Sequence, residues 1–261
     1  MSDLEKIRTS IWQEVPEKNN AYATKTAYCA GYNVYEDIVG NCHWAEMLFL
    51  LFYGEAPTVT QANLLNDLAV AIANPGPRDA SVHAAMCGGV GKSGAASSLI
   101  AALAVGAGQY SGAREVFLVM QYWQQLGKNV AAWSAFLTSK IENKTSTWPE
   151  IDHRPGFDPY GKTTPESVTT LLLKLARHNS DCHLSWLLSE KETLESKANQ
   201  PITMTMVIAT TLIELGFLPE QGEMLTLLLR LPGAAAHALE QKNIGHKNFP
   251  FYPIEYTEEN Q

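Results

Sequence analysis

The chain has 261 residues, of which 46% are hydrophobic and 18% are charged, proportions typical of a folded globular protein. Its formal net charge of -8 argues against nucleic acid as the main partner, because proteins that bind a phosphate backbone usually present a basic face. A small anionic ligand is not excluded, since it needs only a few local arginines.

The compartment is predicted from the cysteines and from the N-terminus. Four cysteines stand apart with no CxxC pair, which is typical of reduced thiols in a cytoplasmic protein: Cys29, Cys42, Cys87 and Cys182. The first residues, MSDLEKIRTS, lack the apolar run of a secretory signal. We therefore expect a cytoplasmic protein.

Helical periodicity dominates the chain and alternating strand patterns are scarce, which predicts an all-α fold. A first helix is expected over residues 43–53, ending at Gly54, and a second is expected to be capped by Thr60. The second helix carries Leu64, Leu65, Leu68 and Ile72 at helical spacing and stops at the breaker cluster of residues 74–77. Further helices are expected over residues 83–90, 93–106 and 115–126.

The second half continues in the same way after a long polar loop over residues 143–164. Pro165 and Glu166 open the next helix, and two more are expected over residues 203–215 and 219–241. Pro232 and Gly233 predict a kink in the last one, and the tail after Gly245 is expected to lie extended on a surface.

The stretch from Ser93 to Ala113 contains no charged residue and is long enough to suggest a membrane span. Its residues are small and partly polar, however, among them Ser97, Ser98 and Gly106. We therefore expect a buried helix packed closely on its neighbours instead.

Two local motifs are examined and rejected. Residues 88–93, GGVGKS, look like a phosphate-binding loop, but the pattern requires glycine where Met86 stands, and a helix is expected upstream instead of a buried strand. Asp181, Cys182 and His183, with His178 nearby, suggest a metal or Cys/His site, but no second ligand cluster follows at a zinc-like spacing. A packed helix end is the favoured interpretation, and no metal is expected.

Several short segments follow one another along nearly the whole chain: GYNVYEDI at 31–38, GEAPT at 54–58, GQYSGA at 108–113, PEIDHR at 149–154, and LPG at 231–233 followed by AHALE at 236–240. In this order they resemble the citrate synthase superfamily. They are similar above all to its short citryl-CoA lyase-like members and to the C-terminal module of ATP-citrate lyase. Each segment is short, and their shared order carries the resemblance.

The resemblance implies an all-α fold with a large and a small helical domain. The large domain would comprise residues 1–112 plus 208–261, and the small domain residues 113–207. The family active site lies between these domains in a dimer, which implies a homodimer. The substrates would be a coenzyme A thioester, lying against residues 148–154, and a small oxo-acid or carboxylate.

The chemistry of that family explains which side chains its scaffold needs. Making or cleaving a carbon–carbon bond next to a thioester requires a base at the alpha carbon and donors for the enolate oxygen. A further donor must polarise the ketone of the second substrate. Each such group typically contributes about two to four decades of rate.

The chain retains only part of that set. By the resemblance, His153 matches the histidine that polarises the oxo-acid carbonyl, and Arg154 matches the adjacent arginine of the lyase-like members. Ser111 replaces the thioester-side histidine, and Pro75 replaces the oxo-acid histidine. Ser111 can still donate a hydrogen bond to an oxyanion.

The general base is the largest departure. Thr205 stands where the family has its catalytic aspartate, and a threonine cannot act as a base at neutral pH. A carboxylate from another position, Asp79, Asp152 or Asp158, would have to replace it. Lys162 falls where many members have an arginine that binds the oxo-acid.

Two hypotheses follow. The first is an enzyme that makes or cleaves a carbon–carbon bond between an acyl-CoA and an oxo-acid with an altered substrate or mechanism. His153 would then be the electrophilic acid and Ser111 an oxyanion donor, and the candidate substrate-binding residues are Arg78, Arg154, Lys162 and Asp152. The second is a catalytically degenerate homologue that binds coenzyme A or a partner subunit without ordinary turnover.

Overall fold

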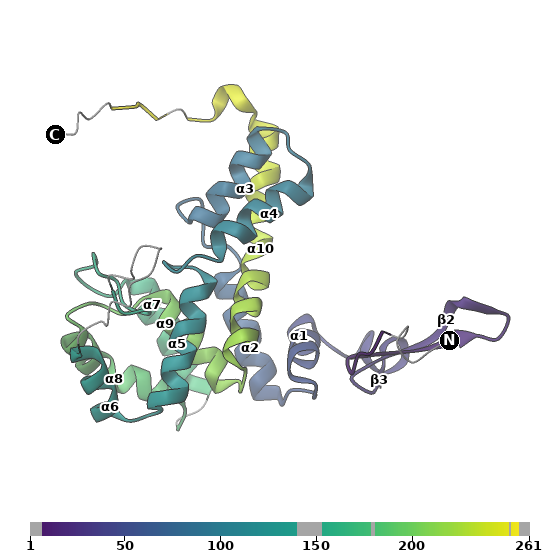
Figure 1. Cartoon of the computed structure of the whole chain (residues 1–261), viewed down its shortest axis with the longest axis horizontal. Coiled ribbons are helices and arrows are strands. Elements are labelled where there is room, and N and C mark those ends of the chain that lie inside the picture. The colour runs from purple at the N-terminus through teal and green to yellow at the C-terminus, as the bar shows by residue number, and fades with distance from the viewer. Residues whose placement is uncertain (1–6, 140–152, 179–180, 251, 256–261) are drawn as a thin grey trace.

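The computed structural model describes residues 7–139, 153–178, 181–250 and 252–255. Within them the chain is mainly helical, which confirms the all-α prediction, and the longest helix, α10, runs through most of the molecule (Figure 1). The α-helices are α1 (Trp44–Tyr53), α2 (Val59–Ile72), α3 (Ala80–Val90), α4 (Ala95–Gly106), α5 (Ala113–Leu126), α6 (Val130–Thr138), α7 (Glu166–Leu175), α8 (His183–Ala198), α9 (Met204–Glu214) and α10 (Pro219–Ile244).

The helix ends follow local capping signals. Gly54 ends α1 in the left-handed conformation, as expected from its sequence. The expected cap of α2 is wrong: Thr58, and not Thr60, begins the helix. The Thr58 hydroxyl accepts from the backbone N–H of Gln61 at 3.3 Å, and the Gln61 side chain accepts from the Thr58 N–H at 2.9 Å. This reciprocal pair satisfies two donors at the helix start and leaves Thr60 inside the first turn.

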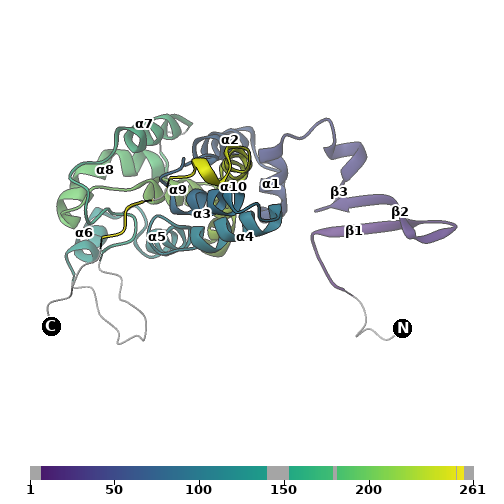
Figure 2. The same cartoon turned by 90° about the horizontal axis from the view of Figure 1, so that it is seen from above.

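An N-terminal arm precedes the helices and projects away from them (Figures 1 and 2). It is an antiparallel sheet of β1 (Trp12–Glu17), β2 (Asn20–Cys29) and β3 (Tyr32–Asn33), followed by a short π-helix, η2 (Val34–Ile38). Every residue of β1 is exposed, and β2 buries only Ala27 and Cys29 near its end, so that the sequence gives little alternating signal there. Cys29, Ile38 and Leu50 form the small core that joins the arm to α1.

The main hydrophobic core lies between α1, α2, α5, α7, α8, α9 and the first half of α10. Tryptophans from three helices meet there, with Trp123 of α5 edge-on to both Trp133 and Trp186. The indole N–H of Trp123 donates to Thr210 of α9 at 2.9 Å, so that this buried donor is satisfied. These contacts hold α6 and α8, two helices beyond those expected from the sequence, against α5.

A second, smaller core joins α3, α4 and the last half of α10. Its packing explains the glycines of the rejected phosphate-binding motif, since both Gly88 and Gly89 lie inside α3. A β-carbon on Gly89 would collide with the backbone of Ala238 in α10, and one on Gly88 would collide with Ser98 in α4. The glycines therefore permit close helix approach.

The charge-free stretch from Ser93 to Ala113 is less buried than expected from the sequence. In α4 only Ser98, Ala102 and Gly106 are buried, so that the helix is covered along one stripe and not on all sides. Its outer face exposes 63% of Ile100 and 44% of Val105. Among the described residues, no helix combines the length and apolar character needed to cross a membrane.

The last helix continues through Pro232, next to the breaker cluster that ends α2. The N–H of Gly233 donates to the carbonyl of Ala73 at 2.8 Å, and a β-carbon on Gly233 would lie 2.6 Å from that same oxygen. His237, one turn later, contacts Asn74 at 3.2 Å. The proline–glycine pair thus lets the turn after α2 approach the backbone of α10.

The close approach of α3 to α10 gives a first prediction. Gly89→Ala forces a methyl group into the backbone of Ala238, and overpacking of this kind typically costs about 1–3 kcal/mol or more. Gly94→Ala is the matched control, because no atom lies within 4 Å of its would-be β-carbon. Urea denaturation should show a clear loss of stability for Gly89→Ala alone; equal effects of the two variants would contradict this packing.

Candidate active site

A buried carboxylate, Glu115 in the first turn of α5, lies at the centre of the candidate site. Its side chain is 2% exposed and contacts three residues in two separate loops. One oxygen, Oε2, accepts from the backbone N–H of Ser111 at 2.6 Å, and Oε1 accepts from the backbone N–H of Gly156 at 2.8 Å. Oε1 also lies 3.7 Å from Nε2 of His153. Glu115 therefore brings the loop before α5 and the loop containing His153 to one point.

The loop of residues 107–112 is held from both sides. Ser111 has a φ of +54°, which is unusual for a residue with a side chain, and its carbonyl accepts from Nη1 of Arg230 at 2.9 Å. Arg230, on α10, also forms an ion pair with Asp79, which caps the start of α3. Since α10, α3 and α5 all fix this loop, the Ser111 backbone has little freedom to move.

His153 lies below the half-exposed ring of Tyr110. The two rings are stacked with their centroids 4.7 Å apart and their planes inclined by 23°. The imidazole itself is buried, with 3% of the residue exposed. His153 is thus enclosed between Tyr110 and Glu115.

The loop after His153 is fixed by the start of α9. The Thr203 N–H donates to the Gly156 carbonyl at 2.9 Å, and Phe157 and Ile202 form an isolated β-bridge. Thr205 is buried in the first turn of α9, with its hydroxyl 2.6 Å from that of Thr203. Gly156 therefore links Glu115 on one side to the threonine pair on the other.

The residues predicted from the sequence divide into two groups. His153 and Ser111 meet at Glu115, and Thr205 lies near them through Thr203 and Gly156. Arg154 turns to α6, where its guanidinium donates to the Ser139 carbonyl at 2.6 Å and lies over the ring of Phe136. Lys162 is exposed beside a polar recess that also includes Lys191 and Gln200.

The structure does not test the roles of two other predicted residues. Arg78 is exposed in the turn between α2 and α3. Asp152, with most of the expected coenzyme A segment 148–154, lies outside the described residues. The substrate-binding roles of Arg78, Arg154, Lys162 and Asp152 therefore stay predictions.

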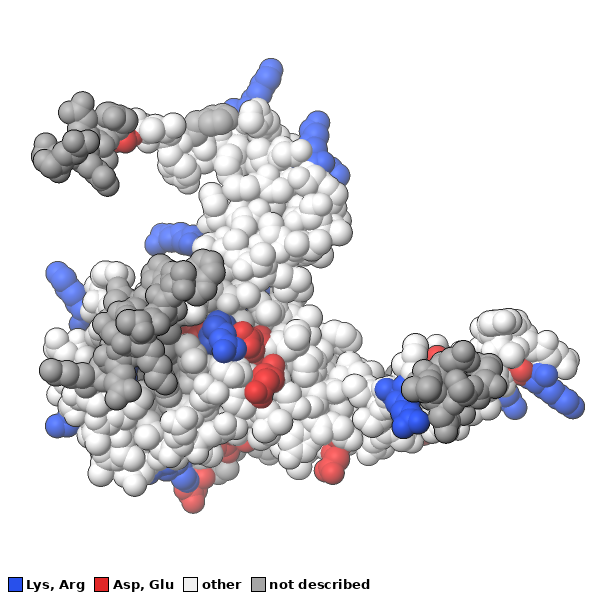
Figure 3. Space-filling model, in the orientation of Figure 1, with Lys and Arg blue, Asp and Glu red and all other residues white. Residues whose placement is uncertain are grey.

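Figure 3 shows a recess between the helical group of α3, α4 and the end of α10 and the group of α5 to α9. The loop of Tyr110 and Ser111 joins α4 to α5, so it connects these two groups. The Glu115 cluster therefore lies where the two helical groups meet.

Sequence reasoning missed three members of this cluster: Glu115, Tyr110 and Arg230. An acidic residue in the first turn of a helix usually complements the helix dipole at the surface, and this pattern hides the burial of Glu115. The one available signal was its spacing, four residues after Ser111, which lets a first-turn side chain reach back to the N–H before the helix.

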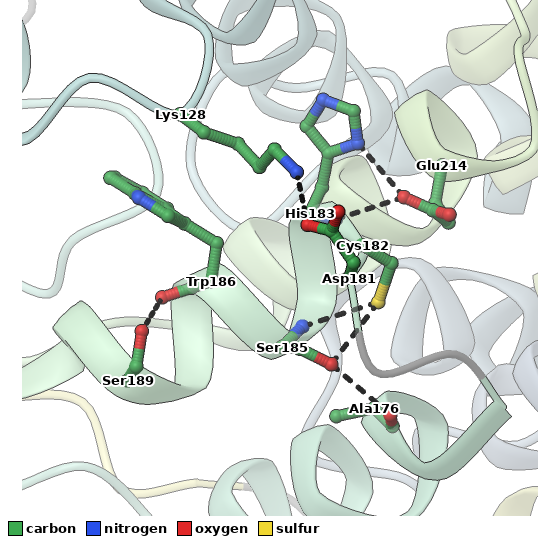
Figure 4. A network of polar contacts seen from close by, with 9 residues as sticks. All are labelled: Lys128, Ala176, Asp181, Cys182, His183, Ser185, Trp186, Ser189 and Glu214. Carbon is green, nitrogen blue, oxygen red and sulfur yellow. Dashed lines mark hydrogen bonds and ion pairs between the residues drawn. The ribbon is translucent and has the colours of Figure 1, made fainter.

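Asp181, Cys182 and His183 lie at the start of α8 (Figure 4), which agrees with the packed helix end favoured from the sequence. The Cys182 sulfur accepts from the Ser185 N–H at 3.3 Å, and Glu214 of α9 accepts from both the N–H and Nδ1 of His183 at 2.9 and 2.8 Å. Lys128 pairs with Asp181 at 2.9 Å. In the described part of the chain, no group of three or more acidic, histidine or cysteine side chains could hold a metal ion.

The comparisons with known proteins identify the fold. Citryl-CoA lyase from Hydrogenobacter thermophilus superposes with a TM-score of 0.73 at 19% identity, over 98% of this chain and 96% of that one. ATP citrate lyase from Methanothrix soehngenii superposes with a TM-score of 0.74 at 18% identity, over 100% of this chain but only 43% of that longer one. Citrate synthase from Thermotoga maritima gives 0.51 at 14% identity, over 99% and 95% of the two chains.

No protein-family model matches the sequence, and no curated protein matches it at a significant level. The likeness therefore lies in the three-dimensional structure, and the chain has the helical fold shared by citryl-CoA lyase and citrate synthase.

The network at α8 gives a pH prediction. Burial raises the pKa of Glu214, but the hydrogen bonds from His183 and the positive charges of His183 and Lys128 outweigh it, so that the pKa lies below its usual value. A lowered pKa in the folded state stabilises the protein above the ordinary glutamate pKa of about 4.3, and this stability is lost as the pH falls through the lower folded value.

Glu214→Gln should therefore lower the free energy of unfolding at pH 7, and the difference from wild type should shrink as the pH falls below about 4. Urea denaturation across this pH range measures the effect, with the exposed Glu192→Gln in α8 as control. A difference that does not change with pH would contradict the assigned role of the Glu214 carboxylate.

Proposed function

We propose that the protein makes or cleaves a carbon–carbon bond between an acyl-CoA and an oxo-acid. The observation that carries the proposal is the meeting of His153 and Ser111 at Glu115. These two residues were assigned to opposite substrates by resemblance alone, from segments about forty positions apart in the sequence. Their convergence on one buried group supports a shared site.

The fold supports the same class of reaction. The similar citryl-CoA lyase spans nearly the whole chain, and the similar ATP citrate lyase was solved in complex with citrate and coenzyme A. A related ATP citrate lyase from Methanosaeta concilii was solved with (3S)-citryl-CoA. Coenzyme A thioesters and a small carboxylate are accordingly the proposed ligands of this chain.

The roles follow from what each side chain can donate. His153 would donate a proton or hydrogen bond to the carbonyl oxygen of the oxo-acid. The Ser111 backbone N–H is already bound to Glu115, so its hydroxyl is the group that would face the thioester oxygen. Arg78, Arg154, Lys162 and Asp152 remain the proposed groups for the substrate carboxylates and coenzyme A.

The domain division and the dimer are part of the proposal. The small domain of residues 113–207 would begin with α5, and its second boundary falls inside α9. The site would lie between this domain and the large domain of residues 1–112 plus 208–261. A second copy would cover the apolar outer face of α4, where Ile100 and Val105 are exposed.

Activity gives the direct test of the proposed function. Incubation with acetyl-CoA in deuterium oxide should give exchange at the alpha carbon, and incubation with citryl-CoA should give acetyl-CoA and oxaloacetate. His153→Ala should reduce either rate by at least about 100-fold, because one positioned acid–base group typically contributes 10²–10⁴-fold. The matched control is His178→Ala, a histidine paired with Asp67 of α2 instead of Glu115.

An equal loss of rate in His153→Ala and His178→Ala would mean that the chemistry does not take place at His153. Binding of coenzyme A in calorimetry, without deuterium exchange and without cleavage of citryl-CoA, would favour the second hypothesis, a homologue that binds without ordinary turnover.

The dimer gives a separate prediction. Ile100→Asp places a charge on the outer face of α4 and should shift the mass in solution from two chains towards one, measured by light scattering after gel filtration. Val59→Asp, at an exposed apolar residue in the first turn of α2, should leave the mass unchanged. A monomeric wild type, or a dimer unaffected by Ile100→Asp, would refute this placement.

A further inference from the structure

The catalytic aspartate of the family is missing from this sequence, so that the proposed reaction lacks its general base. The structure contains a group outside the family pattern that can replace it. Thr205 is a buried hydroxyl engaged with Thr203, so it cannot serve as the base. Of the carboxylates considered from the sequence, Asp79 is held by Arg230 and by the N-terminal amides of α3. Among the residues that the structure describes, Glu115 is the carboxylate seen within 4 Å of the candidate acid, His153, whereas Asp152 lies outside them.

We propose that Glu115 and His153 form a carboxylate–imidazole pair. His153 takes up and returns the proton of the reaction, and Glu115 positions the imidazole and stabilises its protonated form. This inference rests on the proposed function and assigns a role to a residue that the resemblance does not include. Glu115 is a positioning residue here, because it acts through His153.

The hydrogen bonds of Glu115 explain why it would act indirectly. Its two oxygens already accept from the Ser111 and Gly156 amides, on opposite sides of the carboxylate. These fixed donors hold the carboxylate in place, so that it acts on the substrate through His153. The Nε2 atom of His153, 3.7 Å from Oε1, lies within the range at which a negative charge favours the protonated imidazole.

A single imidazole can both remove the proton and return it in this reaction. When the bond forms, neutral His153 takes the proton from the alpha carbon of the thioester, and the resulting enolate carbon attacks the ketone carbon. The ketone oxygen gains the electron pair of the broken C=O π bond and then takes the proton back from His153. Cleavage runs in reverse, with the hydroxyl proton passing through His153 to the alpha carbon. No second base and no external reductant or oxidant is needed.

The pair works only if both protonation states of His153 are accessible near neutral pH. Burial of the imidazole favours its neutral form, whereas the Glu115 carboxylate favours the charged form. Within the described ranges, the charged and titratable groups near His153 include Glu115 from α5, Tyr110 from the preceding loop, and Arg154 beside it, whose guanidinium is directed to Ser139. The side chains at the start of α9 are Thr203 and Thr205, which carry no charge.

Tyr110 covers one route to His153. Its ring covers one face of the imidazole but is 54% exposed, so that a change of side-chain rotamer can uncover His153 without unfolding the loop. The backbone below is held by Arg230 and Glu115, which keeps Ser111 in place while the ring moves.

The test is the titration of His153 by NMR, with the imidazole signals assigned by their loss in His153→Gln. In the wild type His153 should take up a proton above pH 5, because the Glu115 carboxylate 3.7 Å away favours the protonated imidazole. In Glu115→Gln the midpoint of the titration should fall by at least about one unit, because the negative charge is lost while the shape is kept. Glu223→Gln is the matched control, since Glu223 pairs with Arg114 at the protein surface.

A midpoint that is unchanged in Glu115→Gln overturns the pair, and so does a wild-type His153 that stays neutral down to pH 5. The second result needs no variant, so that the test stands even if Glu115→Gln fails to fold. The titration is also independent of turnover. If the His153 midpoint shifts in Glu115→Gln but the wild type gives no deuterium exchange, the pair is retained and the proposed reaction is rejected. If the wild type gives exchange but the midpoint does not shift, the reaction is retained and the pair is rejected.

Discussion

The structure around the candidate site depends on one buried carboxylate. Glu115 is almost completely removed from solvent, and burying such a group is favourable only when its oxygens find donors. The Ser111 and Gly156 amides supply them, and each lies in a loop with no regular structure of its own. The same interactions that satisfy the charge therefore fix the two loops that bear the proposed catalytic side chains.

The two loops reach Glu115 because the helices behind them approach each other closely. Gly89 and Gly88 let α3 lie against α10 and α4, and Gly233 lets the turn after α2 lie against α10. From this frame Arg230 extends to the Ser111 carbonyl and to Asp79 at the start of α3. On the other side, Gly156 leaves room for Met206 of α9, whose side chain would lie 2.8 Å from a β-carbon at that position. Helix packing thus determines the positions of Ser111 and His153.

The sequence predicts much of this architecture, because many helix signals are local. Gly54 marks the end of α1 in the sequence itself, and Leu64, Leu65 and Leu68 show the buried stripe of α2. The N-terminal arm was not predicted, because β1 buries no side chain, and α4 was predicted to be buried on all sides because composition does not show which face meets a neighbour.

The candidate site was predicted only in part, because local sequence patterns do not show tertiary contacts. His153 and Ser111 stand within short segments that can be compared with a family, whereas the roles of Glu115, Tyr110 and Arg230 arise only from tertiary contacts. Arg230 lies 119 positions after the Ser111 carbonyl that it binds, and Glu115 lies 41 positions before the Gly156 amide. No local pattern encodes pairs at such separations.

The central claim, that Glu115 holds both loops of the site, is tested most directly by hydrogen exchange at two backbone amides. The Ser111 and Gly156 N–H groups should exchange slowly in the wild type, and both should exchange at least about tenfold faster in Glu115→Ala, since each loses a hydrogen bond to a charged group. Amides within α8, which do not contact Glu115, should change much less. Fast exchange of either amide in the wild type, or unchanged exchange of both in the variant, would contradict the account.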